Sequence, residues 1–186
     1  SEDGSGTAVI TTEEPIIAGS LGNTCEIVFT AMEKMDGGRI QVLVPTEGHG
    51  QWSPMQISND NATGYVTVTS EGEIDNLITT PVKQENRIIT AITIPIIKLS
   101  KGQMITVVYG AGGKNAGFRA STKVGEHTFT VQSSLKDGTL TDIESSPNQL
   151  VTADGSGQIE VNSNKAGDGA NIVSGSSDET LHFRYT

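Results

Sequence analysis

Oxygen-rich side chains gather in three short segments of the chain, and they are the residue types best suited to binding chemistry. The candidates are Asp60 and Asn61 in the first segment, Glu71, Glu73 and Asp75 in the second, and Asn162, Asn164 and Asp168 in the third. Carboxylate and amide oxygens held on turns are the ligands that Ca²⁺ prefers. None of the segments has the full order of an EF-hand loop, and such clusters also occur in plain turns. We therefore expect Ca²⁺ as the cofactor, bound by some of these residues.

The net charge favours the same kind of ligand. The chain carries a formal charge of −10 at neutral pH. An acidic surface repels nucleic acids and anionic membranes, whereas bound cations relieve the repulsion between acidic copies. No apolar run reaches the roughly 18 residues that a transmembrane helix needs. We expect no nucleic-acid partner and no insertion into a membrane.

The sequence contains no enzyme motif. His49, His127 and His182 lack the spacing of a zinc site, so we expect His49 in a solvated loop and the other two as solvent-facing strand residues. There is no G-x-S-x-G motif, and the glycine-rich run 110–113 is not followed by the Lys and Ser or Thr of a phosphate loop. We expect no enzyme. A hydrolase with two carboxylates facing one cleft remains an alternative, because a sequence does not show which carboxylates meet.

Two residues carry possible covalent chemistry. Cys25 is the single cysteine, which excludes an intramolecular disulfide. It lies among strand-forming residues, so we expect a small buried hydrophobe rather than a nucleophile. Asn61, followed by Ala62 and Thr63, forms an Asn-x-Thr sequon, so it is a candidate glycosylation site, with an unmodified turn as the alternative.

Short alternating runs of apolar residues, separated by turn signals such as Asp36-Gly37-Gly38, account for most of the chain. We expect strands over Thr7–Thr12, Thr24–Thr30, Gly38–Pro45, Gly64–Ser70, Arg87–Ile97, Gln103–Gly110, Glu126–Ser133, Gly157–Ser163 and Thr180–Thr186. The apolar content of 34% and aromatic content of 4% suit such a β-rich protein. The prediction is an all-β fold, an immunoglobulin-like or jelly-roll β-sandwich with a C-terminal two-strand extension.

The extension repeats the start of the chain. The run Asp3-Gly4-Ser5-Gly6 recurs as Asp154-Gly155-Ser156-Gly157, an offset of 151 residues. The run Ile16–Thr30 falls on Ile172–Thr186 at an offset of 156, because the second copy has a longer loop. Two motifs that recur in the same order indicate internal duplication. We expect a domain over residues 3–153 and a strand pair over residues 154–186.

Two strands cannot bury a core of their own, so the extension must dock on something. It can be the last hairpin of its own sandwich, a donor to a neighbouring copy by strand addition, or half of a further repeat in a longer protein. Alternation gives each of its strands one apolar face. The expected contact residues on these faces are Ile159, Val161, Leu181, Phe183 and Tyr185.

The segment Ile16–Pro45 resembles the repeat of secreted prokaryotic surface proteins, which has the form GS-x-GNT, a strand, M-x-GG and a strand ending in Val-Pro. Trp52 and Pro54 match the W-x-P part that follows, after a longer link than the pattern has, and the likeness extends over most of Ile16–Pro147. The resemblance implies an immunoglobulin-like sandwich in a surface layer, adhesin or extracellular fibre. The architecture is also similar in kind to the subunits of archaeal cannulae, extracellular tubes assembled by strand donation with calcium.

These observations predict an extracellular structural protein. We expect a self-assembling subunit of a filament, tube or surface layer, with copies of itself as partners joined by β-strand donation. The alternative is a carbohydrate-binding or cohesin-like module. Such a module needs a face of exposed aromatic residues, and Trp52, Tyr65 and Tyr109 are few and widely spaced in the sequence.

Overall fold

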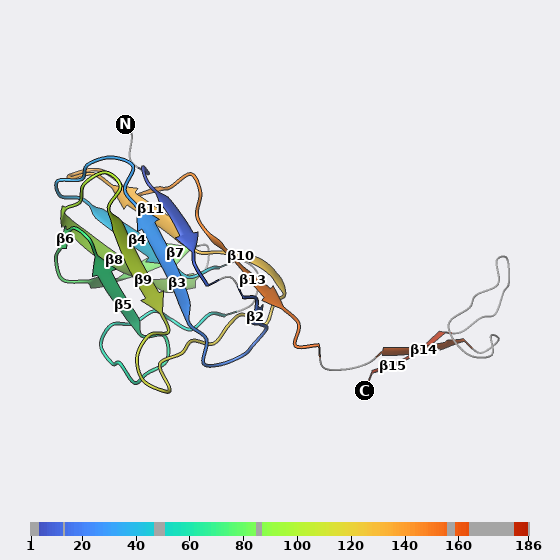
Figure 1. Ribbon diagram of the computed structural model, residues 1–186. Helices are drawn as coiled ribbons and strands as arrows, with labels where there is room; N and C mark the ends of the chain where they lie inside the picture. The colour runs from blue at the N-terminus through green and yellow to red at the C-terminus, as the bar shows by residue number, and fades with distance from the viewer. Residues whose placement is uncertain are drawn as a thin grey trace. The chain divides into compact units, whose positions relative to one another are not determined.

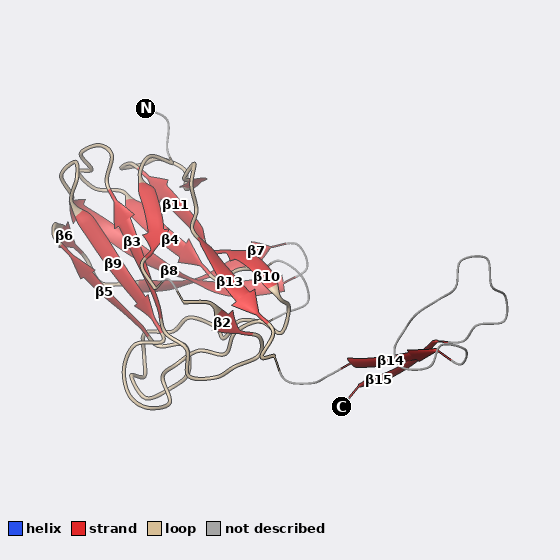
Figure 2. Ribbon diagram, turned by 45° about the vertical axis from the view of Figure 1, so that its right-hand side comes forward, coloured by secondary structure: helices blue, strands red, loops and turns tan. Residues whose placement is uncertain are grey.

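The computed structural model describes residues 4–12, 14–46, 51–84, 87–155, 159–163 and 181–185. The chain divides into two compact units, Ser1–Thr152 and Ala153–Thr186. All regular structure among the described residues is β-strand, as Figure 2 shows. Within these ranges there is accordingly no helix long and apolar enough to cross a membrane.

The first sheet of unit 1 has four antiparallel strands in the order β1-β3-β9-β5 (Figure 1). Their bounds are Thr7–Ile10 for β1, Cys25–Thr30 for β3, Met104–Tyr109 for β9 and Val66–Ser70 for β5. β3 is the second strand in this order and pairs with β1 on one side and β9 on the other. β1 and β5 form the two edges.

The second sheet has the order β12-β11-β4-β8-β6, and β7 also pairs with β8. The bounds are Thr141–Asp142 for β12, Thr130–Ser134 for β11, Arg39–Leu43 for β4, Arg87–Lys98 for β8, Glu73–Ile74 for β6 and Ile78–Gln84 for β7. A smaller sheet joins β10 (Gly125–Thr128), β13 (Asn148–Thr152) and β2 (Ile16–Ile17), with β2 parallel to β13.

The core lies between the two large sheets, because each strand turns its alternate side chains inward. In β3 the buried positions are Cys25, Ile27 and Phe29, and every second residue between them is only partly buried. Isoleucine and valine from β4, β8 and β9 complete the apolar layer. The predicted all-β sandwich is therefore confirmed.

An aromatic cluster fills one part of this core. The rings of Tyr109 and Phe118 stack with centroids 4.1 Å apart, and Trp52 packs on Phe118 and Phe129 at 5.5 and 5.3 Å. The hydroxyl of Tyr109 donates a hydrogen bond to the backbone carbonyl of Ser53. Trp52 and Tyr109 are thus core residues and do not form an exposed aromatic face.

β7 occupies an edge of the second sheet, and Pro81 lies at its centre. The N–H of Asp75 donates to the carbonyl of Pro95, so the odd-numbered residues of β8 direct their peptide groups toward β6 and β7. Pro81 is the register partner of Thr90, an even-numbered residue. Its nitrogen therefore points to the free edge, where no ladder bond is needed.

In unit 2, β14 (Ile159–Ser163) and β15 (Leu181–Tyr185) form an antiparallel pair. Ile159 lies opposite Tyr185, and Val161 lies opposite Phe183. Arg184 is exposed.

Candidate functional site

The strand pair of unit 2 repeats the pairing of β1 with β3, residue for residue. In unit 1, Ala8 lies opposite Phe29. The sequence offset of 151 carries Ala8 to Ile159, and the offset of 156 carries Phe29 to Tyr185. These two residues lie opposite each other in β14 and β15. The two copies therefore share their pairing register as well as their sequence pattern.

The same offsets relate the expected contact residues to core positions. Ile159, Val161, Leu181, Phe183 and Tyr185 correspond in that order to Ala8, Ile10, Cys25, Ile27 and Phe29. Four of the unit 1 residues are buried in the core, and the fifth packs against it. The surroundings of the five unit 2 side chains lie outside the described part of the structure, so their role as contacts stays a prediction.

The Asp-Gly-Ser-Gly run has a structural purpose at the start of β1. Gly6 has a φ of 120°, and a Cβ atom there would overlap the Phe29 ring. The Ser133 hydroxyl donates to the Ser5 carbonyl at 2.8 Å, which ties the run to the second sheet. Gly4 and Gly155 both have a positive φ, 88° and 71°. In sequence, the second copy keeps both residue types, because Gly157 corresponds to Gly6 and the aromatic Tyr185 to Phe29.

The first acidic segment packs against a neighbouring loop. The Gly113 N–H donates to the carbonyl of Asp60 at 2.8 Å, and the Asn61 amide donates to the Asp60 carboxylate, also at 2.8 Å. Asn61 is exposed, as a glycosylation acceptor must be, and its modification stays a prediction.

The second acidic segment supports its own turns. The Glu71 carboxylate accepts the Met104 N–H at 2.8 Å, and the Asp75 carboxylate accepts the Asn76 N–H at 2.7 Å. Glu73 is the first residue of β6. The two bonds give Glu71 and Asp75 a local function in the fold.

The third acidic segment is described only at Asn162, in β14, while Asn164 and Asp168 lie outside the described residues. Across the described ranges, no three His, Cys, Asp or Glu side chains come close enough to hold a metal ion. Backbone carbonyls and asparagine oxygens can also bind Ca²⁺. The calcium site therefore stays a prediction.

Cys25 is fully buried and has no disulfide partner, as predicted. Burial raises the pKa of its thiol to about 11, and the charge of Glu26 adds to the rise. Because the thiolate is the nucleophile, this thiol is unreactive at neutral pH.

His127 corrects one prediction. The strand pattern predicts a solvent-facing side chain, but only 1% of its surface is exposed. Its Nε2 lies 2.8 Å from the carbonyl of Lys123, and its ring meets Trp52 edge-on at a centroid distance of 5.6 Å. β10 belongs to the small third sheet, and it turns this side chain toward the aromatic cluster. His49 and the side chain of His182 lie outside the described residues.

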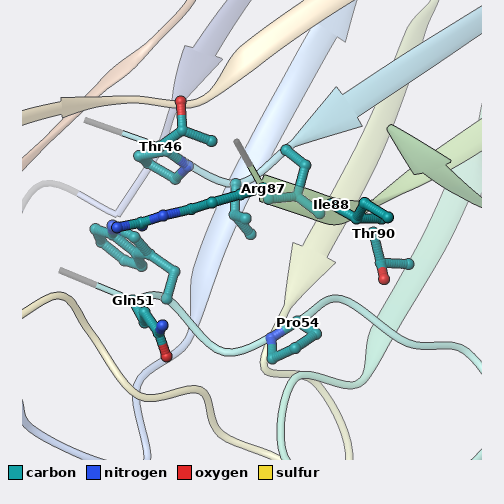
Figure 3. Close-up of a pocket in the computed structure, with 10 residues that line it drawn as sticks. Thr46, Gln51, Pro54, Arg87, Ile88 and Thr90 are labelled. Atoms are coloured by element: carbon teal, nitrogen blue, oxygen red, sulfur yellow. The ribbon is translucent and has the colours of Figure 1, made fainter. Parts of the chain in front are cut away.

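Sequence reasoning missed a groove of about 400 Å³ beside the end of β4 (Figure 3). It is lined by Val44, Pro45, Thr46, Gln51, Trp52, Pro54 and the start of β8, Arg87–Thr90. Ile88 is 77% exposed there. The only sequence signals are Pro45 after a strand and an apolar run in β8 that is longer than its neighbour.

The groove contains an open strand edge. The ladder between β4 and β8 ends at the pair Val42 and Ile92. The Ile96 N–H donates to the Gly38 carbonyl, so even-numbered residues of β8 direct their peptide groups toward β4. The peptide groups of Ile88 and Thr90 consequently face the groove.

No family model matches the chain, and no curated protein matches it. Among solved structures, it is similar to the bacterial hydrophobin BslA, with 16% identity and a TM-score of 0.46 over 82% of this chain and 98% of that one. It is also similar to a non-cellulosomal cohesin from the hyperthermophilic archaeon Archaeoglobus fulgidus, with 10% identity and a TM-score of 0.35 over 81% of this chain and 94% of that one.

Proposed function

We propose that the protein is a structural subunit of an extracellular self-assembling filament, tube or surface layer, joined to its neighbours by donated β-strands. One observation carries the proposal: β14 and β15 repeat the register of β1 and β3. In unit 1, that pair is stable because its inner face is buried in the sandwich.

The described secondary structure of unit 2 consists of two strands, β14 and β15. A two-stranded sheet is at best marginally stable in water. Among the described residues, β14 and β15 pair only with each other, and strand edges without a neighbour favour pairing with another chain. Docking on a second copy buries the apolar face and uses these edges, and each copy both donates and accepts. Such a head-to-tail contact produces a ring or an open polymer.

The extracellular location belongs to the same proposal. It is supported by the resemblance of Ile16–Pro147 to repeats of secreted surface proteins. A net charge of −10 on every subunit opposes close packing, and bound cations relieve this repulsion; Ca²⁺ is the proposed cation.

The test compares the full chain with a variant that lacks residues 154–186. Electron microscopy and light scattering in the presence of Ca²⁺ are expected to show polymers of the full chain and monomers of the variant. Circular dichroism should show that both contain a folded sandwich. Long polymers of the shortened variant, or monomers of the full chain over a wide range of concentration and Ca²⁺, would exclude strand donation by the C-terminal pair.

A second candidate function is a carbohydrate-binding or cohesin-like module. The groove beside β4 favours it, because an open strand edge lies next to the exposed Ile88 and to Arg87. If the groove binds a ligand, Arg87→Ala and Ile88→Ser should abolish binding in a glycan and protein array without changing assembly. Thr79→Ala, on the outer strand of the same hairpin and outside the groove lining, is the matched control.

A further inference from the structure

We infer that the C-terminal strand pair of one copy occupies, in a second copy of this chain, the place that β1 and β3 hold in the structure. The inference rests on the proposed function, which names a second copy as the acceptor but not the surface that accepts the strands. It specifies this surface as the edge of β9 together with the core beneath it.

The shared register is the first step. β3 pairs with β9 over its whole length, from Cys25 opposite Tyr109 to Thr30 opposite Met104. Since β15 is the counterpart of β3, the same pairing brings Leu181 opposite Tyr109 and Phe183 opposite Val107 of the second copy. No new register has to be found, because β14 already holds β15 as β1 holds β3.

The inward faces provide the second step. Ile159, Leu181 and Phe183 replace Ala8, Cys25 and Ile27, so the donated pair carries more apolar carbon at three of the five core positions. Apolar area removed from water is the main favourable term in association. At a fourth position, Tyr185 replaces Phe29 and retains an aromatic ring, and at the fifth, Val161 replaces Ile10.

The outward faces provide the third step. Val9 and Val28 lie opposite each other on the outer face of the first sheet, and Val9 is 55% exposed. Their counterparts, Glu160 and Arg184, are also register partners. Opposite charges facing each other across two strands stabilise a solvated sheet surface. The donated pair is therefore apolar on the face that must enter the core and charged on the face that must remain in water.

The exchange releases β1 and β3 of the accepting copy. β1 is an edge strand with β3 as its only sheet neighbour, so within this sheet the pair separates by opening the ladder between β3 and β9. The pairing of β2 with β13 and the hydrogen bond from Ser133 to Ser5 must open as well. Exchange of equivalent elements between copies is a low-cost route to assembly, because the incoming strands rebuild the same ladder and fill the same core. The fully buried Cys25 leaves the core with β3.

Cys25 therefore reports on the exchange through its reactivity with a thiol reagent such as DTNB. In the variant without residues 154–186 we expect slow modification, because the thiol is fully buried. In the assembled full chain we expect modification at least tenfold faster. A variant with Cys25→Ala and Leu181→Cys is the matched control, and its thiol should become protected on assembly.

The possible results separate the two proposals. Polymers in which Cys25 stays as unreactive as in the shortened variant would overturn the exchange and leave strand donation to another acceptor standing. Polymers in which the Leu181→Cys thiol remains reactive would do the same. Absence of polymers would overturn the proposed function, and the exchange with it.

Discussion

At the scale of single residues, Gly6 shows how tightly the start of β1 fits. Its backbone is left-handed, and the Phe29 ring occupies the space that a side chain would need. Gly102 also has a positive φ but has open space around it. Substitutions at the two glycines can therefore be compared to separate the cost of backbone strain from the cost of steric overlap.

We predict that Gly6→Ala destabilises unit 1 by about 2–4 kcal/mol, since it adds overlap to strain. Gly102→Ala should cost only about 1 kcal/mol, from strain alone. Urea unfolding, monitored by tryptophan fluorescence, measures both. Equal losses in the two variants would contradict the role assigned to the Phe29 contact.

The buried thiol of Cys25 makes the free energy of unfolding depend on pH in the alkaline range. Its thiol has a folded pKa of about 11, against an ordinary value of 9.0. A raised folded pKa contributes stability that is complete below the unfolded pKa and is lost as the pH rises through the folded pKa. The window of loss is thus pH 9 to 11, and the shift corresponds to about 3 kcal/mol.

We expect the unfolding free energy to fall across this window by about 3 kcal/mol more in the native chain than in a Cys25→Ala variant. Burial raises the pKa of Tyr109 as well, and the charge of Cys25 adds to that rise, so the contribution of Tyr109 cancels only in part in the difference. Parallel curves for the two proteins between pH 9 and 11 would contradict the prediction.

At the scale of strands, the sequence predicted the elements whose apolar alternation is clear. Each of the nine expected runs overlaps a strand of the structure. The run Glu126–Ser133 is divided, because Phe129 interrupts the pairing between β10 and β11. β7 was not predicted, since Pro81 argues against a strand unless the residue lies on a free edge. β13 was also missed, because its polar residues give no apolar alternation.

The candidate site was likewise predictable only in part. The repeat of β1 and β3 was predicted, because the two copies still share sequence motifs in the same order. The groove beside β4 was not, because it depends on where one ladder ends and on which neighbours leave a space. His127 was misplaced for a related reason, since the packing of the third sheet decides which of its faces is interior.

Equivalent strands allow paired substitutions with opposite effects on assembly. Ile27→Val weakens the hold of β3 on its own core by about 1 kcal/mol. It should therefore release β3 more readily and speed polymer growth several-fold. Phe183→Leu, at the counterpart position, weakens the donor and should slow growth. Light scattering at equal protein concentration measures both rates, and a change of the same sign in both variants would argue against exchange.

At the scale of the whole molecule, the charge of −10 governs how copies approach each other. Monovalent salt screens this repulsion, whereas specific sites for Ca²⁺ neutralise it by binding. We predict that Ca²⁺ at about 1 mM supports polymers, that NaCl at equal ionic strength does not, and that a chelator dissolves them. Sedimentation measures the polymer fraction. Equal polymer fractions with the two salts would show that screening is sufficient and that no calcium site is needed.

Pro81 has a consequence for solubility. The hairpin of β7 and β8 exposes Ile78 and Ile88, and a flat edge with such residues can seed amyloid-like stacking. Proline offers no N–H to an incoming strand, and Lys83 places a charge beside it. The edge thus opposes the uncontrolled addition of further strands. This favours ordered contacts between copies over misassembly. Pro81→Thr should increase thioflavin T fluorescence on prolonged incubation, while Pro54→Thr, outside the strands, should leave it at the native level.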